Sequence, residues 1–406
     1  MPLRPSIALI AEMLPPWLVA NFNATAEHID LSLVVLDAPS QTADIATTRD
    51  VRIRCVPLPD RAAEGSELFH RIELSLASIQ PDAVLTFGWN GGKNLATLSW
   101  ALRSGTPAIV TTDSNDGDFP RSALKEAFKR RLLALFSAGW AAGSRSTAYL
   151  EKLGMPKERI VTGPVDSVDL RHFEAGADAA RNDAAAKRAA LGLPERYFLA
   201  VSRLSPEKNL PSLVRAFARY KSRAGAAAWE LVIVGEGPSR PDIEQAIVAC
   251  GLAQSVTMAG WVGFDDTPTY YGLASAFILA SVRDTWAVVV NEAAAAGLPI
   301  LVSNRVGSAP DLVDEGRNGF TFDPSDTDQI AACLWRVANG NCDLATMGAE
   351  SRKIIAQWNP EHYAASLLEV TRVALNMPRV RSTMIDRAIV RILASSQLRQ
   401  RRPRSP

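Results

Sequence analysis

The sequence DTWAVVVNE occupies residues 284–292, the alanine-rich AAAAGLP follows at residues 293–299, and an apolar ILV comes at residues 300–302. Alanine favours a helix, Gly297 is suited to end it, and Pro299 prevents the helix from resuming. The apolar residues after that proline have the composition of a buried strand. A helix that leads through a short turn into such a strand is typical of a parallel α/β sheet.

Two carboxylates, those of Asp284 and Glu292, lie at the mouth and in the body of the expected helix. At 3.6 residues per turn, a spacing of eight positions brings them back to roughly the same helix face. The free amides at a helix entrance favour phosphate, and carboxylates accept hydrogen bonds from sugar hydroxyls. The stretch therefore suits a nucleotide sugar as ligand.

Size and composition narrow the class of protein. The chain has 406 residues, which suggests two or three domains. A net charge of +1 argues against a protein that binds nucleic acid through its overall charge. No window reaches the roughly 20 apolar residues of a membrane span. The apolar run near the start of the sequence is too short for a signal peptide, so we expect a cytoplasmic protein. The four cysteines lack metal-binding spacing and are expected to be reduced thiols: Cys55, Cys250, Cys333 and Cys342.

Short apolar runs alternate with amphipathic stretches along the whole chain, and this alternation predicts parallel sheets covered by helices. The expected strands are Ser6–Ile10, Leu31–Leu36, Val51–Val56, Ala83–Thr86, Ala108–Thr111, Trp140–Ala142, Ile160–Thr162, Tyr197–Val201, Leu231–Val234, Val256–Ala259, Ala276–Leu279, Ile300–Val302 and Gly319–Phe322. The expected helices are Leu68–Ser78, Asn94–Arg103, Ser122–Phe136, Ser146–Lys152, Leu210–Ser222, Arg240–Cys250, Tyr270–Leu273, Trp286–Ala296, Ala309–Glu315 and Thr327–Ala338.

Composition also sets the expected domain boundaries. The Ala-, Asp- and Arg-rich stretch around residues 174–190 has the character of a linker that runs into a helix. We expect two Rossmann-like, doubly wound domains facing a central cleft, with ligand at the carboxyl ends of the strands. The predicted segments are an acceptor-binding domain at 1–172, a linker at 173–194, a donor-binding domain at 195–360, a helix returning towards the first domain at 361–378, and a basic amphipathic helix with a disordered tail at 379–406.

Two cationic residues stand in the loop after the expected strand Tyr197–Val201. Arg203 and Lys208 lie five positions apart, just before a helix. A guanidinium binds a diphosphate as a fork and an ammonium binds it as a point charge, so the two can converge on one diphosphate. The alternative is an ordinary solvated loop.

Glycine-containing turns follow two other strands of the second half. Gly235 begins a Gly-Glu-Gly-Pro turn in which the backbone could approach a ligand closely, although many strand-to-helix turns carry such glycines. Gly307 and Ser308 could supply amides or a hydroxyl to a sugar. A plain turn before Pro310 explains that second segment equally well.

Taken together, these segments resemble the donor half of the retaining glycosyltransferases of family 4, which have the GT-B fold. The resemblance runs from about Tyr197 to about Ala338. Four signatures occur in the family's order: the Arg/Lys loop, the Val-Gly-Glu-Gly-Pro turn, an E-x7-E-like element, and an Asn-Gly-Phe turn at residues 318–320. The resemblance implies transfer of a sugar from a nucleoside diphosphate with retention of configuration and without an essential metal or cofactor.

The resemblance also implies roles for single residues. Arg203 and Lys208 would neutralise the donor diphosphate, Glu292 would hold the ribose hydroxyls, and Asp284 would contact the transferred sugar. Backbone near Trp261 would face the base, and we expect a UDP-sugar in preference to a GDP-sugar. The implied catalytic residues are Asp284, Lys208, Arg203 and Asp113. The implied donor-binding residues are Arg203, Lys208, Gly235, Trp261, Val262, Asp284, Trp286, Ala287, Val288 and Glu292.

Two departures from the family pattern lie where the sugar is expected. The first acid is Asp284 rather than the usual glutamate, and the glycine usual two or three residues later is replaced within Thr285-Trp286-Ala287. In the first half, Asp113 stands where the family often has a histidine. Asp113 could orient an acceptor hydroxyl or the donor sugar, or it could be a helix cap or turn former.

Basic residues cluster in two places. The helix expected at 122–136 carries Lys125, Lys129, Arg130 and Arg131, and residues 379–406 carry eight arginines against one acid. A charged solvated face explains the helix; contact with an anionic membrane, on the inner face of the cytoplasmic membrane, would use both segments.

The sequence as a whole predicts a metal-independent hexosyltransferase of polysaccharide or glycolipid biosynthesis. Its expected partners are a nucleotide-sugar donor and a glycan or lipid-linked acceptor, without nucleic acid. The alternatives are a nucleotide-sugar epimerase of the same fold and a non-catalytic scaffold in a polysaccharide assembly complex.

Overall fold

A computed structural model describes residues 4–12, 18–36, 51–58, 65–118 and 122–399. The chain divides into two compact units, each with its own core. Unit 1 comprises Met1–Ser114, Phe119–Ser167 and Pro360–Pro406, and unit 2 comprises Asn115–Asp118 and Val168–Asn359.

Unit 1 is built on a parallel sheet with the strand order β3-β2-β1-β4-β5-β6-β7. All strands predicted for this part of the chain are present, with ends shifted by a few residues. Their bounds are β1 Ser6–Ala11, β2 Asp30–Val35, β3 Arg54–Pro57, β4 Ala83–Phe87, β5 Ala108–Thr112, β6 Ala138–Ala142 and β7 Ile160–Gly163.

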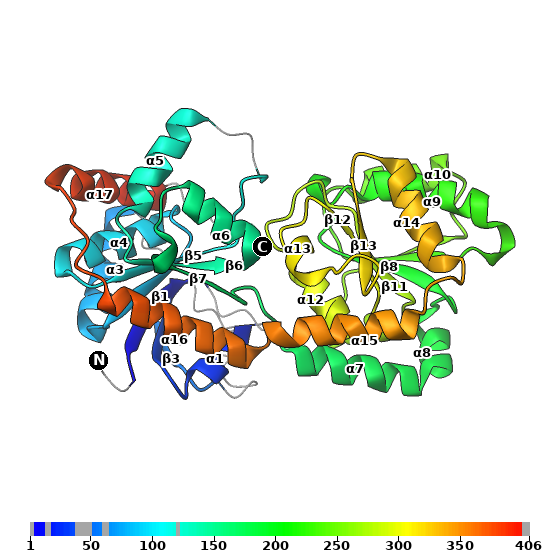
Figure 1. The fold of residues 1–406 in the computed structure, drawn as a ribbon, viewed down its shortest axis with the longest axis horizontal. Helices are drawn as coiled ribbons and strands as arrows, with labels where there is room; N and C mark the ends of the chain where they lie inside the picture. The colour runs from blue at the N-terminus through cyan, green and yellow to red at the C-terminus, as the bar shows by residue number, and fades with distance from the viewer. Residues whose placement is uncertain (1–3, 13–17, 37–50, 59–64, 119–121, 400–406) are drawn as a thin grey trace. The chain divides into compact units, whose positions relative to one another are not determined.

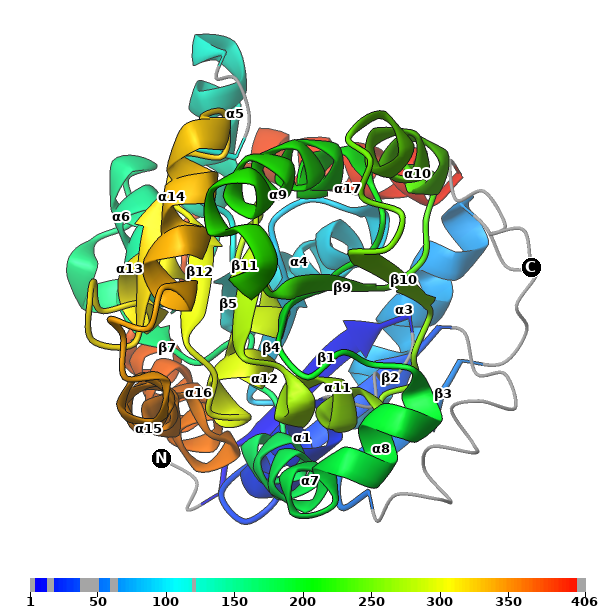
Figure 2. The ribbon, with the colours of Figure 1, turned by 90° about the vertical axis from the view of Figure 1, so that its right-hand side faces the viewer.

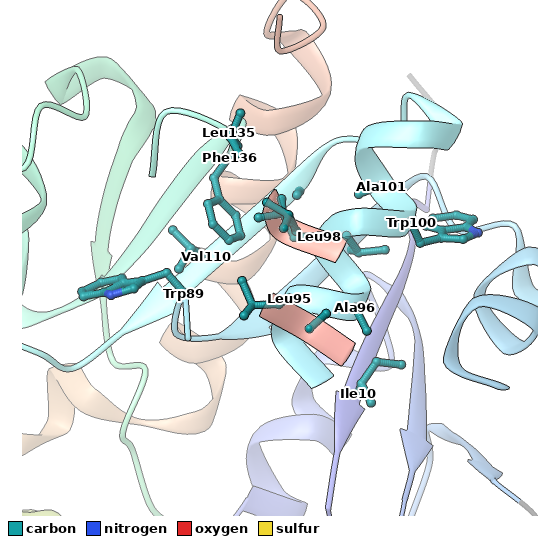
Figure 3. Close-up of a cluster of buried hydrophobic side chains, with 14 of the residues drawn as sticks. Ile10, Trp89, Leu95, Ala96, Leu98, Trp100, Ala101, Val110, Leu135 and Phe136 are labelled. Atoms are coloured by element: carbon teal, nitrogen blue, oxygen red, sulfur yellow. The ribbon is translucent and has the colours of Figure 1, made fainter. Parts of the chain in front are cut away.

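Helices cover both faces of this sheet. The helices of unit 1 are α1 Val19–Thr25, α3 Gly65–Ile79, α4 Gly92–Ser104, α5 Ala123–Leu133, α6 Gly143–Lys152, α16 Pro360–Asn376 and α17 Met384–Arg399. Helices α1 and α16 pack together on one face, whereas α3, α4 and α17 lie on the other (Figure 1). Figure 3 shows the core on that second face, where Leu95 and Leu98 of α4 lie near Val110 of β5.

Unit 2 repeats the architecture on a second parallel sheet with the strand order β10-β9-β8-β11-β12-β13. Its strands, all predicted, are β8 Tyr197–Val201, β9 Glu230–Val234, β10 Val256–Gly260, β11 Ala276–Leu279, β12 Ile300–Ser303 and β13 Gly319–Phe322. Its helices are α7 Leu170–Asn182, α8 Ala184–Leu191, α9 Leu210–Ala224, α10 Arg240–Ala249, α11 Thr267–Leu273, α12 Val288–Ala295, α13 Ala309–Leu312, α14 Thr327–Ala338 and α15 Leu344–Ile355. Figure 2 shows α9, α10 and α14 on one face of the sheet and α7, α11 and α12 on the other.

Several elements differ from the prediction. Helix α12 begins at Val288 rather than at Trp286, and α13 ends at Leu312. The expected linker at 173–194 instead forms most of α7 and α8, which pack within unit 2. Helices α1 and α15 were not predicted. Residues 400–406, expected to form a disordered end, lie outside the described residues.

The strand order of unit 2 indicates where on this sheet a ligand is expected to bind. The chain runs from β8 outward through β9 to β10, and then returns to β11 on the other side of β8. The loops after β8 and β11 therefore lead away from each other, and this topological switch point is where doubly wound sheets bind ligands. The candidate residues of unit 2 follow these strands. A cleft between the two units stays a prediction.

Candidate active site

Backbone hydrogen bonds tie together the loops at the carboxyl edge of the unit 2 sheet. The amide of Val282, after β11, donates to the carbonyl of Glu207, after β8, over 2.9 Å. The amide of Gly307, after β12, donates to the carbonyl of Asp284, also over 2.9 Å. The β9 loop joins the row because Leu204 donates to Glu236 over 2.9 Å. These bonds join the backbone of the loops that carry the candidate residues, and groups held in place in this way favour catalysis.

The central feature of this edge is an ion pair at the switch point. The Nζ atom of Lys208 lies 2.5 Å from Oδ2 of Asp284, and their side chains are only 16% and 12% exposed. The Ser281 hydroxyl also donates to this carboxylate, over 3.4 Å. Lys208 ends a 3₁₀ turn, Pro206–Lys208, which the backbone bond between Val282 and Glu207 fastens to the β11 loop. Two residues 76 positions apart are thus brought into one partly buried pair.

Asp284 does not lie on α12, so the argument that placed both acids on one helix face is wrong. It forms an isolated parallel bridge with Val306, four residues before the helix begins at Val288. The reason for the late start is Ala287, whose φ of 72° and ψ of 75° are left-handed. Ala287 holds a conformation that glycine adopts more easily, at the position where the family pattern led us to expect a glycine.

Glu292 does lie on α12, and it faces a tyrosine of α11. The Tyr271 hydroxyl donates to its carboxyl over 2.7 Å. Burial raises the pKa of Glu292 to about 7, despite that hydrogen bond. Burial also raises the pKa of the Tyr271 phenol, which therefore stays a donor. Near neutral pH the Glu292 carboxyl is close to half ionised, so a ligand that donates hydrogen bonds can draw it fully into the charged form.

Arg203 has a different partner from Lys208. Its exposed guanidinium donates to Oε1 of Glu207 over 2.8 Å, and the Ser205 hydroxyl donates to the same oxygen over 2.7 Å. Hydrogen bonds from Ser205, from the backbone and from Arg203 lower the pKa of Glu207 to about 2. In this structure the two cations predicted to converge on a diphosphate are therefore held by separate carboxylates.

The glycines predicted to approach a ligand are required by contacts between loops. A Cβ atom at Gly235 would lie 1.9 Å from the carbonyl oxygen of Ser202. One at Gly307 would lie 1.6 Å from the carbonyl oxygen of Thr285. Any other residue at either position would push neighbouring loops apart. The glycine turns thus serve first to pack the edge that carries Lys208 and Asp284.

The remaining predicted donor residues lie along the same edge. Trp261 and Val262 directly follow β10, and the Trp261 indole is exposed. The Trp286 side chain is only 1% exposed because it packs on Trp358, with its Nε1 donating to Asn291 over 3.0 Å. Ala287 and Val288 offer backbone amides, since the first turn of a helix leaves its amides without helical partners.

Two hydroxyls of the edge, those of Ser202 after β8 and Ser308 after β12, have no hydrogen-bond partner within the described residues. The Oγ atom of Ser308 is fully buried after β12 and makes no hydrogen bond. A buried hydroxyl without a protein partner is uncommon, and either of these two can form a further hydrogen bond.

Asp113 lies in the other unit, directly after β5. It is not a helix cap, since the N-cap of α5 is Ser122. In the turn that follows, the amide of Asn115 donates to Asp118 over 2.7 Å. A role for Asp113 towards the donor or acceptor stays a prediction.

Sequence reasoning missed the residues that hold the predicted ones. Ser281 supports Asp284, Tyr271 supports Glu292, and Glu207 supports Arg203. Only Glu207 carried a signal, because it lies four positions after Arg203. Across the described ranges, no group of three His, Cys, Asp or Glu residues is placed to hold a metal ion. No described helix has the length and apolar character needed to cross a membrane.

Comparison with known proteins supports the family resemblance of this region. Residues 195–339 match the family model described as Glycosyl transferases group 1, which confirms the predicted resemblance of this region. The chain is 31% identical over 222 residues to the GDP-mannose-dependent alpha-(1-6)-phosphatidylinositol monomannoside mannosyltransferase of Mycobacterium tuberculosis. That match covers 52% of this chain and 57% of the relative, so the chain spans little more than half of the relative's length.

Solved structures confirm the predicted GT-B fold. A glycosyltransferase from Rickettsia africae aligns with a TM-score of 0.72 at 14% identity, over 92% of this chain and 99% of that one. HepE from Anabaena, solved in complex with UDP, aligns with a TM-score of 0.70 at 15% identity, over 90% of this chain and 98% of that one. Both identities are low, so these structures establish the architecture alone.

Proposed function

We propose that this chain is a glycosyltransferase that moves a sugar from a nucleoside-diphosphate donor to a hydroxyl of a glycan or lipid-linked acceptor, with retention of configuration. The observation that carries the proposal is the ion pair of Lys208 and Asp284 at the switch point of unit 2. The family match of residues 195–339 and the UDP bound by HepE, a protein of the same fold, support it.

In this proposal Lys208 stabilises the leaving diphosphate. Its ammonium lies where the loops after β8 and β11 diverge, and it is little exposed, so its charge is weakly screened by water. The free amides at the start of α12 add positive potential on the same side. Charge that builds up on the departing phosphate oxygen is then met by groups already in place.

Asp284 and Glu292 hold the two sugar parts of the donor. Asp284 is fixed by Lys208 and Ser281, and it accepts a hydroxyl of the transferred sugar. Glu292 accepts the ribose hydroxyls, which favour its ionised form. The bond between the sugar carbon and the phosphate oxygen breaks, the acceptor oxygen bonds to that carbon from the same face, and the acceptor proton passes to the leaving phosphate oxygen. Asp113 orients the acceptor.

The substitution Lys208→Ala tests the central step. We expect kcat to fall by about 10²–10³-fold, the usual effect of removing one group that stabilises transition-state charge. Lys221→Ala is the matched control, since Lys221 is also a partly buried lysine of unit 2, paired with Glu230 over 3.4 Å, but it lies on α9. Equal turnover by wild type and Lys208→Ala, in a folded protein, would contradict the assignment.

Donor choice is tested by thermal shift with a panel of UDP- and GDP-sugars, since a ligand bound only by the folded state raises its apparent stability. The donor that stabilises the protein is then incubated with it alone. Isomerised donor without any acceptor would indicate an epimerase, and binding with neither transfer nor hydrolysis would indicate a scaffold.

A further inference from the structure

Helix α17 is an integral part of unit 1. Its residues Val390, Ala394 and Leu398 recur every four positions, are buried, and belong to the same core cluster as α3 and α4. The contact is close, since a Cβ atom at Gly92 of α4 would lie 2.6 Å from the Leu398 side chain. The basic helix predicted near the end of the chain therefore has one face committed to the fold.

The opposite face of α17 is also apolar, which is unusual for a surface helix. The side chains of Met384, Ile385, Ile389 and Ile392 are all exposed, Met384 to 78%. A helix that only covers a core carries polar residues on its outer side. This outer face therefore has apolar area that nothing in the described chain covers.

Helix α5 presents a second apolar group beside it. Leu124 is 82% exposed and Phe128 lies one turn further on, also exposed. The Arg131 guanidinium of α5 donates to Asp386 of α17 over 2.8 Å, so the two helices are joined. Of the eleven large hydrophobic side chains that are exposed in the described chain, six lie on these two helices. Such concentration marks an interaction surface.

The charge of the same region is strongly positive. Helix α5 and residues 379–398 carry eight basic and two acidic side chains, whereas the whole chain has a net charge of only +1. Lys125, Arg130, Arg381 and Arg391 are exposed among the apolar residues. Apolar side chains interspersed with arginine and lysine complement the acyl chains and anionic headgroups of a lipid bilayer.

We infer that the surface formed by Leu124, Phe128, Met384, Ile385, Ile389 and Ile392, here called the α5–α17 surface, docks on an anionic membrane. Its apolar side chains enter the interface and the neighbouring basic residues lie at the lipid phosphates. The inference does not rest on glycosyl transfer, because the surface belongs to unit 1 and its binding is measured without a donor.

Point substitutions test this inference better than truncation, since removing α17 would open the unit 1 core. The probe is co-sedimentation of the full chain with vesicles of phosphatidylcholine alone or mixed with phosphatidylglycerol. The double variant Ile385→Ser/Ile392→Ser should bind mixed vesicles about a hundredfold more weakly. The triple variant Lys125→Ser/Arg130→Ser/Arg381→Ser should lose a similar factor, roughly fivefold per charge.

Matched variants in unit 2 serve as controls. Leu191→Ser/Val248→Ser removes exposed apolar residues, and Arg215→Ser/Arg219→Ser/Lys353→Ser removes exposed charges. Both should bind like wild type, and all variants should keep the wild-type melting temperature. Equal binding by all proteins, or binding that ignores phosphatidylglycerol, would overturn the inference. A second contradictory result would be a dimer in sedimentation that Ile385→Ser/Ile392→Ser converts to a monomer without changing vesicle binding. That result would assign the surface to contact with a second copy of the chain.

Discussion

Units 1 and 2 share one architecture but concentrate their unusual residues in different places. In unit 2 they gather at the carboxyl edge of the sheet: a partly buried ion pair, a carboxyl with a raised pKa and a left-handed alanine. In unit 1 they gather on the outer helices α5 and α17, as exposed apolar side chains among basic ones. A doubly wound domain thus leaves both its strand ends and its outer helices available for function. In this chain the unusual residues lie at the strand ends in unit 2 and on the outer helices in unit 1.

The largest effect expected from this comparison concerns the two faces of α17. Leu398→Ala removes a side chain buried in the unit 1 core and should lower the free energy of unfolding of that unit by about 3 kcal/mol. Ile392→Ala, on the exposed face of the same helix, should change it by less than about 0.5 kcal/mol. Urea denaturation followed by circular dichroism measures both. Equal effects would mean that α17 has no inner and outer face.

A smaller effect is expected from Glu292 as the pH changes. Its pKa of about 7 in the folded chain exceeds the ordinary value, so the folded state binds this proton more tightly than the unfolded state does. The resulting stability is present below the ordinary pKa and is lost as the pH rises to about 7. Between pH 5 and pH 8, wild type should lose about 2 kcal/mol relative to Glu292→Gln, allowing for partial exposure.

Glu207→Gln provides the control, because the pKa of Glu207 is shifted the other way, to about 2. The stability that Glu207 contributes is present above its ordinary pKa and is lost only as the pH falls towards 2. Its difference from wild type should therefore stay constant between pH 5 and pH 8. A stability difference between wild type and Glu292→Gln that also stays constant over this pH range would show that the pKa of Glu292 is not raised.

The smallest effect tests the strain at the entrance of α12. Ala287→Gly should stabilise unit 2 by about 1 kcal/mol, because glycine adopts the left-handed conformation without the Cβ clash. The same change inside the helix, Ala294→Gly, should destabilise by about 1 kcal/mol or more. Melting temperatures of the two variants should move in opposite directions, and a common direction would show that Ala287 is not strained.

The sequence predicted what depends on local pattern. Every strand was predicted because a short apolar run between turn residues is the pattern of a strand in a buried parallel sheet. Helix α15 was missed although Asp343 marks its start by accepting hydrogen bonds from Ala345 and Thr346, a signal that sequence inspection could have used. The alanine-rich stretch at 173–194 was taken as a linker, because alanine favours a helix without showing what that helix packs against.

The candidate site was predicted in composition and not in geometry. Lys208 and Asp284 were both named, yet their pairing depends on strand order, which brings together loops 76 residues apart. The start of α12 was misplaced because the left-handed residue is an alanine and not the glycine that would have signalled a break. The inward face of α17 was likewise not predicted, since its partners on α3 and α4 lie about 300 residues earlier in the chain.

The segment from Pro360 to Pro406 belongs to unit 1 although it follows all of unit 2. A ribosome therefore releases the strands of unit 1 long before Val390, Ala394 and Leu398 exist to close its core. Unit 2, apart from Asn115–Asp118, is one continuous stretch and can fold while synthesis continues. Domains usually mature in the order of translation. Unit 1 is therefore completed only after unit 2 has been synthesised, and the apolar surface that α17 covers stays uncovered until that helix emerges.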